Sequence, residues 1–425
     1  MENNSIMLLI RSPLSQTPAW EWLGPDWTAR IITHAAALDI EVPDGVEVRV
    51  VNSYDATSEL EAAVIEEYRR RPFARLEAFH ERDLLRAARL RGLLRLPGQS
   101  YVSALSFRDK VRMKDAWTRA GVPVTDYVAI EHPCDLLDFA ARHEESPIVV
   151  KPRLEAGSRG VSVLQGREQT RAWLDRVWSR QPDGSIPFWL AEGYVEGQLM
   201  QVDGIVHGDR VEICWPSQVG DLLGWRKDAP GPVMFEMLDP SDALVRRARA
   251  LVARALDALP TPEVTAFHAE MWVTPEDDLV MNEIGARVGG ALTAPMIKAG
   301  FGVDLRRRFI ECALDPEKVG RSGSESEPGV SAGFALLPRQ PGLVVAVDEV
   351  PERLRRPWLL DLAVHVVPGV RSAAAVNSVD AAAHCLVMGA DRAQVSARLR
   401  SVTDFLTGAI HYQDAEEQAQ GRILV

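Results

Sequence analysis

The sequence predicts a mixed α/β and α+β protein with more than one domain. Its 425 residues exceed the usual length of a single domain. Strand-like and helical patterns alternate in the first hundred residues, which favours a small parallel sheet. The last hundred residues hold several β-like runs and one helical run, which is typical of an α+β unit. The content of 46% hydrophobic and 25% charged residues is that of a globular protein.

The composition excludes several classes of protein. A net charge of −12 argues against a nucleic-acid-binding protein, which would carry a basic surface. A basic stretch at 69–95 is interrupted by acidic residues and has apolar residues at helical spacing, so amphipathic helices are expected there. The four cysteines form no CxxC pair, which fits a cytoplasmic protein without disulfides or a zinc site. The first residues are too weakly apolar for a signal peptide, and no run reaches the roughly 18–20 residues of a membrane span.

Residues 1–105 are expected to form an N-terminal α/β domain. Strands are expected at 6–10 and 46–51, and helices near 27–39 and from 58 to 94. No GxGxxG motif follows the first strand, so no dinucleotide site is predicted. A Leu-Pro-Gly-Gln-Ser stretch at 96–100 marks the domain boundary.

Two lysines are notable in residues 106–190. Lys110 lies in the first turn of a helix expected over 108–121, where a positive charge is unfavourable against the helix dipole. Lys151 ends a strand expected at 148–151. Taken alone, Lys110 is best explained as an ordinary surface lysine, whereas the position of Lys151 at the end of a strand strengthens the interpretation of the loop that follows it.

The loop after that strand is rich in small residues. It contains Gly157, Ser158 and Gly160, and a strand is expected to return from it at 161–164. Small residues at such a turn allow backbone N–H groups to approach phosphate oxygens. The alternative is a plain hairpin whose glycines serve only its geometry.

Residues 191–318 are expected to contain a β-hairpin with two facing carboxylates. The β-like runs 264–273 and 279–284 flank a short acidic turn that contains proline. A four-residue loop puts Glu270 opposite Glu283. Like charges facing each other on a sheet cost about 0.2–1 kcal/mol, and a hard divalent cation between them removes that cost. The alternative is two exposed carboxylates on a solvated hairpin.

The remaining elements complete the expected organisation. Strands are also expected at 188–191, 198–206 and 210–215, a loop at 220–237, and helices at 241–259, 295–299 and 305–313. A Ser-, Gly- and Glu-rich linker is expected at 319–329, before a C-terminal α+β domain at 330–425. That domain is expected to contain strands at 330–336, 343–350, 364–367 and 373–379 and a helix at 392–405.

The order of these features resembles that of the ATP-grasp superfamily. The order is a helix lysine, a strand-end Lys-Pro with a Gly/Ser loop, a strand that ends in glutamate, the carboxylate hairpin, and an arginine in a Gly-rich loop. The resemblance is to carboxylate–amine ligases typified by bacterial L-amino acid ligases (dipeptide synthetases), and it is strongest over 100–312. It implies an ATP-grasp fold with an N-terminal Rossmann-like (pre-ATP-grasp) domain, a lid subdomain at 106–190, a core subdomain at 191–318 and an extra C-terminal domain.

The resemblance also implies an activity. It is the ATP-dependent joining of a carboxylate to an amine through an acyl phosphate, with release of ADP and phosphate. ATP and Mg²⁺ (or Mn²⁺) would be required, and both substrates would be small molecules that the sequence does not identify. A carrier protein for the acid and a homodimer are compatible with it. An ATP-grasp carboxylase or carboxylate kinase-like enzyme, and a nucleotide-binding module without catalysis, stay open as alternatives.

The resemblance implies roles for individual residues. The nucleotide would be bound by Lys110, Lys151, Gly157, Ser158, Gly160, Glu192, Tyr194, Val195 and Glu196. Glu270 and Glu283 would bind the metal, and Arg287 would stabilise charge on the transferring phosphate. Residues near the substrates would be Asp203, His268, Gly289 and Gly290, with Asp203 or His268 as the base. Many relatives have a ribose-binding glutamate where this chain has Leu199, so either Glu196 replaces it or the contact is absent.

Overall fold

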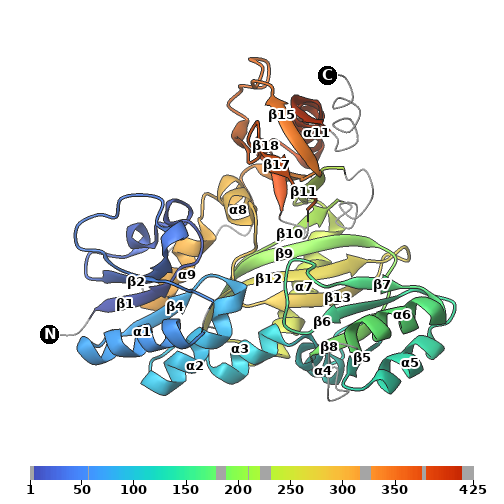
Figure 1. Ribbon diagram of the computed structural model, residues 1–425, viewed down its shortest axis with the longest axis horizontal. Coiled ribbons are helices and arrows are strands. Elements are labelled where there is room, and N and C mark those ends of the chain that lie inside the picture. The colour runs from blue at the N-terminus through green and yellow to red at the C-terminus, as the bar shows by residue number, and fades with distance from the viewer. Residues whose placement is uncertain are drawn as a thin grey trace, which may run out of the picture.

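The computed structural model describes residues 4–55, 57–178, 188–208, 210–220, 231–315, 327–375 and 380–413. Four sheets and the helices packed on them make up this part of the chain. Figure 1 shows an N-terminal unit in blue, a second unit in green, and central strands with the C-terminal elements in orange and red above them. None of the helices in these ranges is both long and apolar enough to cross a membrane.

The N-terminal unit is built on a parallel sheet with strand order β3-β2-β1-β4. Its strands are β1 (Ser5–Leu9), β2 (Thr28–His34), β3 (Glu47–Val51) and β4 (Arg75–Ala78). Its helices are α1 (Thr57–Arg70) and α2 (Leu84–Leu94), with short turns η1 (Leu14–Gln16), η2 (Ala19–Trp22), η3 (Ala35–Ala37) and η4 (Glu81–Asp83).

Two predictions for this unit are wrong. The helix expected near 27–39 is mainly strand β2, and the helices expected from 58 to 94 are interrupted by strand β4. Both strands are buried almost throughout. A strand that is buried on both faces lacks the alternation of apolar and polar residues by which a half-buried strand is predicted.

The second unit contains a four-stranded sheet of order β5-β8-β6-β7. Its elements are α3 (Tyr101–Arg108), α4 (Lys110–Arg119), β5 (Tyr127–Ile130), α5 (Pro133–Arg142), β6 (Ile148–Pro152), β7 (Ser162–Leu164), α6 (Gly166–Trp178) and β8 (Trp189–Gly193). Helix α4 is the helix expected over 108–121. It begins after Asp109, whose side chain accepts a hydrogen bond from the N–H of Val111 and so caps the helix. This cap makes Lys110 the first residue of helix α4.

The central sheet has eight strands in the order β13-β12-β9-β10-β11-β14-β18-β16, all antiparallel. Its strands are β9 (Gln198–His207), β10 (Arg210–Val219), β11 (Val233–Met237), β12 (Val264–Val273), β13 (Leu279–Gly285), β14 (Ser331–Pro338), β16 (Leu359–Val364) and β18 (Ala381–Gly389). Helices α7 (Ala243–Asp257), α8 (Thr293–Phe301) and α9 (Leu305–Leu314) pack on it around a core that includes Trp117, Trp215 and Phe267.

The C-terminal strands continue the central sheet, because β11 pairs with β14. The expected core subdomain and C-terminal domain therefore share one sheet, and the position of the domain boundaries stays a prediction. A small sheet of β17 (Arg371–Ser372), β15 (Gly342–Val347) and β19 (Ile410–Gln413), and helix α11 (Arg392–Ala409), complete this part.

Several predictions here need correction. Strand β11 lies in the expected loop at 220–237, β18 was not expected, and β16 precedes the strand expected at 364–367. Residues 221–230, most of the linker expected at 319–329, and the last part of the strand expected at 373–379 lie outside the described residues.

Candidate active site

The β12–β13 hairpin brings two carboxylates side by side. Glu270 is directly opposite Glu283, as predicted. The turn differs from the prediction, because Val273 pairs with Leu279 and the loop holds residues 274–278. One additional residue, Asn282, then forms a β-bulge and restores the pairing of the two glutamates.

The bulge and two lysines surround these carboxylates. Asn282 donates from Nδ2 to Glu270 Oε2 (3.0 Å), and its Oδ1 accepts a hydrogen bond from Lys151 Nζ (2.9 Å). Lys110 Nζ lies 3.1 Å from Glu283 Oε2. All five side chains line a hollow of about 90 Å³. The sequence did not reveal Asn282, because a bulge leaves no periodic pattern.

The loop between β6 and β7 borders the same hollow. Gly157 (φ 67°) and Ser158 (φ 58°) line it in left-handed backbone conformations. Gly160 has φ 74°, and a Cβ there would lie 2.9 Å from a proline ring, so this position requires glycine. The carbonyl oxygen of Glu155 accepts a hydrogen bond from Lys110 Nζ at 2.6 Å, which ties the loop to helix α4.

Glu192 lies between two buried lysines. Its Oε1 is 2.5 Å from Lys151 Nζ, and its Oε2 is 3.2 Å from Lys114 Nζ. Burial alone would raise the pKa of Glu192, but Lys114 and Lys151 outweigh burial and lower the pKa to about 2. No prediction included Lys114. The available signal was its spacing of four residues from Lys110, which puts both lysines on one face of helix α4.

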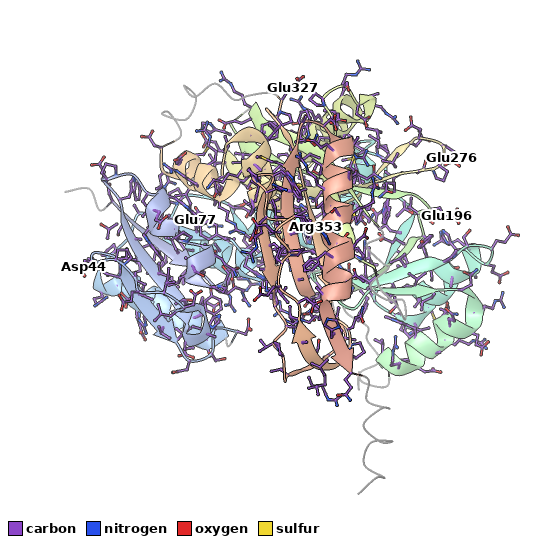
Figure 2. The ribbon with its side chains drawn as sticks, turned by 90° about the horizontal axis from the view of Figure 1, so that it is seen from above. Asp44, Glu77, Glu196, Glu276, Glu327 and Arg353 are labelled. Carbon is purple, nitrogen blue, oxygen red and sulfur yellow. The ribbon has the colours of Figure 1, made fainter. Side chains whose placement is uncertain are left out.

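A second, mostly apolar hollow of about 100 Å³ adjoins Lys151. The end of β8 contributes Glu192, Tyr194 and Val195, and apolar walls come from Val149, Val163, Leu199, Trp272 and Met281. Glu196 is exposed and does not line this hollow, and Figure 2 shows it at the edge of the molecule. Apolar walls beside a few polar groups suit a small aromatic ligand.

Arg287 is held by an acidic residue of the N-terminal unit. Its Nε donates to Glu81 Oε2 at 2.5 Å, and Arg108 Nη1 donates to Glu81 Oε1 at 2.5 Å. Burial alone would raise the pKa of Glu81, but the two arginines outweigh it and lower the pKa to about 2. Glu81 was not predicted, because no local pattern links residues that are 206 positions apart.

Arg287 also lines two separate cavities. It lines a small hollow together with Glu283 and His268. It also lines a larger cavity of about 310 Å³ between the N-terminal unit and the central sheet. This cavity is bordered by β4, the 97–100 segment and the start of β12. A bound molecule in the cavity would therefore reach the hairpin at Arg287.

The predicted substrate-side residues meet on the same sheet. His268 Nδ1 lies 2.8 Å from Asp203 Oδ1, and His268 Nε2 lies 3.6 Å from Glu270 Oε1. Burial alone would lower the pKa of His268, but Asp203 and Glu270 raise it to about 9. Gly289 lies so close that a Cβ would come within 2.5 Å of Asp203 Oδ1, whereas Gly290 is exposed with no atom near its Cβ position. Gly290 is thus the member of this set that stands apart.

Comparison with solved structures establishes the fold. L-amino acid ligase from Bacillus licheniformis is similar with a TM-score of 0.77 over 97% of this chain and 100% of that chain, at 17% identity. Carboxyaminoimidazole ribonucleotide synthase from Aspergillus clavatus, crystallised with ATP, gives a TM-score of 0.67 over 96% of this chain and 100% of that one, at 14% identity. These are ATP-grasp enzymes, so the chain has the ATP-grasp fold, as predicted.

Sequence comparison finds ligases among the relatives. L-arginine-specific L-amino acid ligase of Bacillus subtilis is 23% identical over 238 residues, which are 55% of this chain and 56% of that protein. D-alanine–D-alanine ligase of Staphylococcus saprophyticus is 23% identical over 234 residues, 51% of this chain and 64% of that protein. The chain thus spans a little over half the length of the curated relatives it matches. No protein-family model matches it. The predicted resemblance to ATP-grasp carboxylate–amine ligases is confirmed.

Proposed function

We propose that the chain is an ATP-dependent carboxylate–amine ligase that forms an amide bond and releases ADP and phosphate. One observation carries the proposal, namely the bulged hairpin on which Glu270 and Glu283 face each other with Lys110 and Lys151 beside them. Arg287 follows directly after this hairpin and borders both the small hollow that it shares with Glu283 and His268 and the larger cavity. The named relatives, which include an L-amino acid ligase and a D-alanine–D-alanine ligase, support it.

In this proposal ATP occupies the two hollows that adjoin Lys151. The adenine ring lies in the apolar hollow beside Tyr194 and Val195. The phosphates lie in the hollow with Lys110 and the loop that carries Gly157 and Ser158. The continuity of the two spaces supports this order, because Lys151 and Ser158 line both of them.

The donor set of the hairpin fits magnesium. Glu270 and Glu283 offer oxygen ligands at facing positions, where two carboxylates without a cation would repel each other. These two residues would hold the ion, and when bound it would neutralise negative charge on the phosphate oxygens. Lys110 and Lys151 would neutralise the remaining negative charge of the phosphates.

The first chemical step activates the acid. An oxygen of its carboxylate attacks the γ-phosphorus of ATP, the bond from that phosphorus to the β,γ-bridging oxygen breaks, and ADP leaves. Arg287, fixed by Glu81, would orient the carboxylate at the mouth of the 310 Å³ cavity, which holds the rest of the acid. The loop bearing Gly157 and Gly160 would exclude water that would hydrolyse the acyl phosphate.

The second step makes the amide. The amine nitrogen attacks the carbonyl carbon, the carbon–oxygen bond to phosphate breaks, and the nitrogen loses a proton. Arg287 would stabilise the developing oxyanion. Asp203 would receive the proton at Oδ2, which has no hydrogen-bond partner among the described residues, because His268, 2.8 Å from Asp203 Oδ1, has a pKa raised to about 9 and is already protonated.

Trapping with hydroxylamine tests this function. The protein is incubated with ATP, magnesium and a panel of carboxylic acids, including the common amino acids, and hydroxamate, ADP and phosphate are measured. An acyl phosphate reacts with hydroxylamine to give a hydroxamate and phosphate, so acid-dependent hydroxamate with one ADP for each product is expected. Formation of AMP and pyrophosphate would refute the proposal.

A carboxylase is the second candidate, favoured by one observation. Several structural neighbours are N5-carboxyaminoimidazole ribonucleotide synthetases, and another is a biotin carboxylase domain in complex with ADP and bicarbonate. Bicarbonate-dependent release of ADP with no requirement for another acid would favour this candidate. ATP binding with no turnover under any of these conditions would favour a binding module.

A further inference from the structure

Three side chains that can bind a metal ion meet where strand β9 ends. They are His207 of β9, Glu212 of β10 and Cys312 of α9, and their ligand atoms all lie within 4.8 Å of one another. His207 is directly opposite Val264, the first residue of β12, so the group lies at the other end of β12 from the hairpin turn. The absence of a CxxC pair argues against zinc only for ligands that are close in the sequence, whereas these three come from separate elements.

A β-bulge brings Glu212 to this group. Val211 and Ile213 pair with successive residues of β9, so Glu212 is the extra residue on β10. A bulge interrupts the regular alternation of a strand and re-aims a side chain, and bulges are frequent next to functional sites. Here the bulge leaves Glu212 Oε1 at 3.4 Å from His207 Nδ1.

The distance between these two atoms suits two ligands of one ion better than a hydrogen bond. Hydrogen bonds between nitrogen and oxygen are usually about 2.7–3.2 Å long. Nitrogen and oxygen ligands of a tetrahedral zinc ion are about 3.3 Å apart, which is close to the 3.4 Å between His207 Nδ1 and Glu212 Oε1. The ligand atom of Cys312 lies within 4.8 Å of both partners, and since about 3.6 Å is needed, a movement of about 1 Å completes the set.

Arg308 holds the other oxygen of Glu212. Its Nε donates to Glu212 Oε2 at 3.0 Å, which leaves Oε1 on the side of His207. Carboxylates that bind a metal are commonly oriented by a hydrogen bond of this kind. The ion pair with Arg308 therefore explains one oxygen of Glu212 and leaves the second oxygen, the imidazole and the thiol to bind an ion.

We propose that His207, Glu212 and Cys312 bind a zinc ion that is separate from the magnesium of the ligase reaction. A thiolate and an imidazole favour zinc, whereas magnesium takes oxygen ligands. Three protein ligands leave the fourth position of a tetrahedral zinc ion to water. The ion joins helix α9 to the ends of β9 and β10. Because Phe309 and Ala313 of α9 line the cavity of about 310 Å³, bound zinc also stabilises one wall of that cavity.

The group is enclosed, but solvent reaches one side of it. Cys312 is fully buried, whereas the side chains of His207 and Glu212 are 13% and 9% exposed. Burial raises the pKa of the Cys312 thiol to about 12, so the thiol is protonated in the free protein. Zinc enters from the side of His207 and Glu212, and the thiol gives its proton to the solvent as the bond between sulfur and zinc forms.

Metal titration of the 425-residue chain without an affinity tag tests the inference. The protein is treated with EDTA, dialysed, and titrated with zinc chloride against a chromogenic chelator, with magnesium in excess to occupy the hairpin carboxylates. Cobalt chloride replaces zinc in a second titration, because cobalt bound to a thiolate gives a charge-transfer band in the near ultraviolet and cobalt bound to oxygen alone does not. The variants are Cys312→Ala and His207→Gln. The control is Cys134→Ala, which removes the exposed cysteine close to His132.

One zinc ion per chain is expected for the wild type and for Cys134→Ala, with the thiolate band in cobalt. Cys312→Ala should lose the band. Both Cys312→Ala and His207→Gln should bind zinc roughly a hundredfold more weakly or worse, since the loss of a residue that only orients a ligand already costs about 10- to 100-fold. Zinc should raise the Tm of the wild type and leave that of the two variants unchanged.

Two results would overturn the inference. One is a wild-type chain that binds zinc no more tightly than the variants. The other is a thiolate band that Cys134→Ala loses and Cys312→Ala keeps, which would assign the metal to the exposed cysteine. His207 is partly exposed, so His207→Gln decides the question even where Cys312→Ala does not fold. Neither titration depends on ATP or on turnover, so the ligase function is tested separately.

Discussion

The two sides of the candidate active site differ in how far their polar groups are paired within the protein. On the hairpin side, Lys110 contacts Glu283, and Lys151 contacts both Asn282 and Glu192. On the β9–β10 side, Gln201 Nε2, Ser217 Oγ and Asp203 Oδ2 have no hydrogen-bond partner among the described residues. Charged groups on the first side hold one another in position before any ligand arrives.

This difference in pairing predicts different effects of substitutions on the two sides. Paired buried charges are costly to separate, so substitutions on the hairpin side should disturb both the shape and the chemistry of the site. Buried groups without partners destabilise the free protein, so their replacement by apolar side chains of similar shape should leave the fold intact. The predictions below test this contrast, from the largest expected effect to the smallest.

Glu283→Gln should give the largest loss. It removes a carboxylate from the hairpin while keeping the shape of the side chain, so ADP formation should fall by roughly 10²–10³ or more. The magnesium concentration needed for half-maximal rate should rise in the same variant. Glu276→Gln, at the exposed tip of the same hairpin (Figure 2), is the matched control and should keep full activity. Equal magnesium dependence in both variants would remove Glu283 from the metal site.

Glu81→Gln should lower stability by about 3–5 kcal/mol at neutral pH, because it leaves two buried arginines without their shared partner. The pKa of Glu81 is lowered from 4.5 to about 2. The ionised form is favoured in the folded state, so its contribution is full above pH 4.5 and is lost as the pH falls towards 2. Urea unfolding across this range should show a weaker acid dependence in the variant.

The matched control for this measurement is Glu66→Gln. Glu66 forms an ion pair with Arg49 at 2.7 Å, but its side chain is 61% exposed. Such pairs contribute about 0–1 kcal/mol. If the two variants lose the same stability, burial adds nothing to the stability that the ion pairs of Glu81 with Arg287 and Arg108 contribute.

Lys114→Met should weaken nucleotide binding. The lysine is fully buried, and burial lowers its pKa despite the nearby Glu192. Its removal leaves Lys151 as the one described cation within contact distance of Glu192, so Lys151 should be drawn away from the phosphates. We expect the KM for ATP to rise roughly tenfold, with a smaller change in kcat. Calorimetric titration with ATP checks this, and Lys298→Met, an exposed lysine on α8, is the control.

Glu196→Ala should have the smallest effect. The residue is exposed and does not line the apolar hollow, so the KM for ATP should change by no more than about twofold, as for most surface substitutions. A tenfold rise would instead assign Glu196 to the ribose, which is one of the two alternatives that Leu199 leaves open. The measurement therefore decides the one nucleotide contact that Leu199 puts in question.

A site residue could be predicted from the sequence when the residues around it formed a recognisable pattern. Glu270 facing Glu283 followed from the hairpin pattern alone, and a period of two put His268 on the face of Glu270. Lys110 and Lys151 gained meaning only from their order along the chain. The fold class, ATP-grasp, followed from that same order together with the resemblance.

The residues that escaped prediction are defined by packing. Glu81 meets Arg287 only because the N-terminal unit lies against the central sheet. Asn282 contacts Lys151 and Glu270 only because of a bulge, and the unpartnered atoms of Gln201 and Ser217 are visible only once burial is known. Strands β2 and β4 were missed because strands buried on both faces carry no alternation.

The pairing of β11 with β14 has a practical consequence for dissecting this chain. A truncation before residue 330 would remove β14 and leave the backbone groups of β11 without their neighbour. Exposed edges of this kind recruit strands from other molecules, so such a fragment should aggregate even though it retains Lys110, Lys151, Glu270, Glu283 and Arg287. The C-terminal residues therefore act as a lateral cover for the sheet that carries the candidate active site.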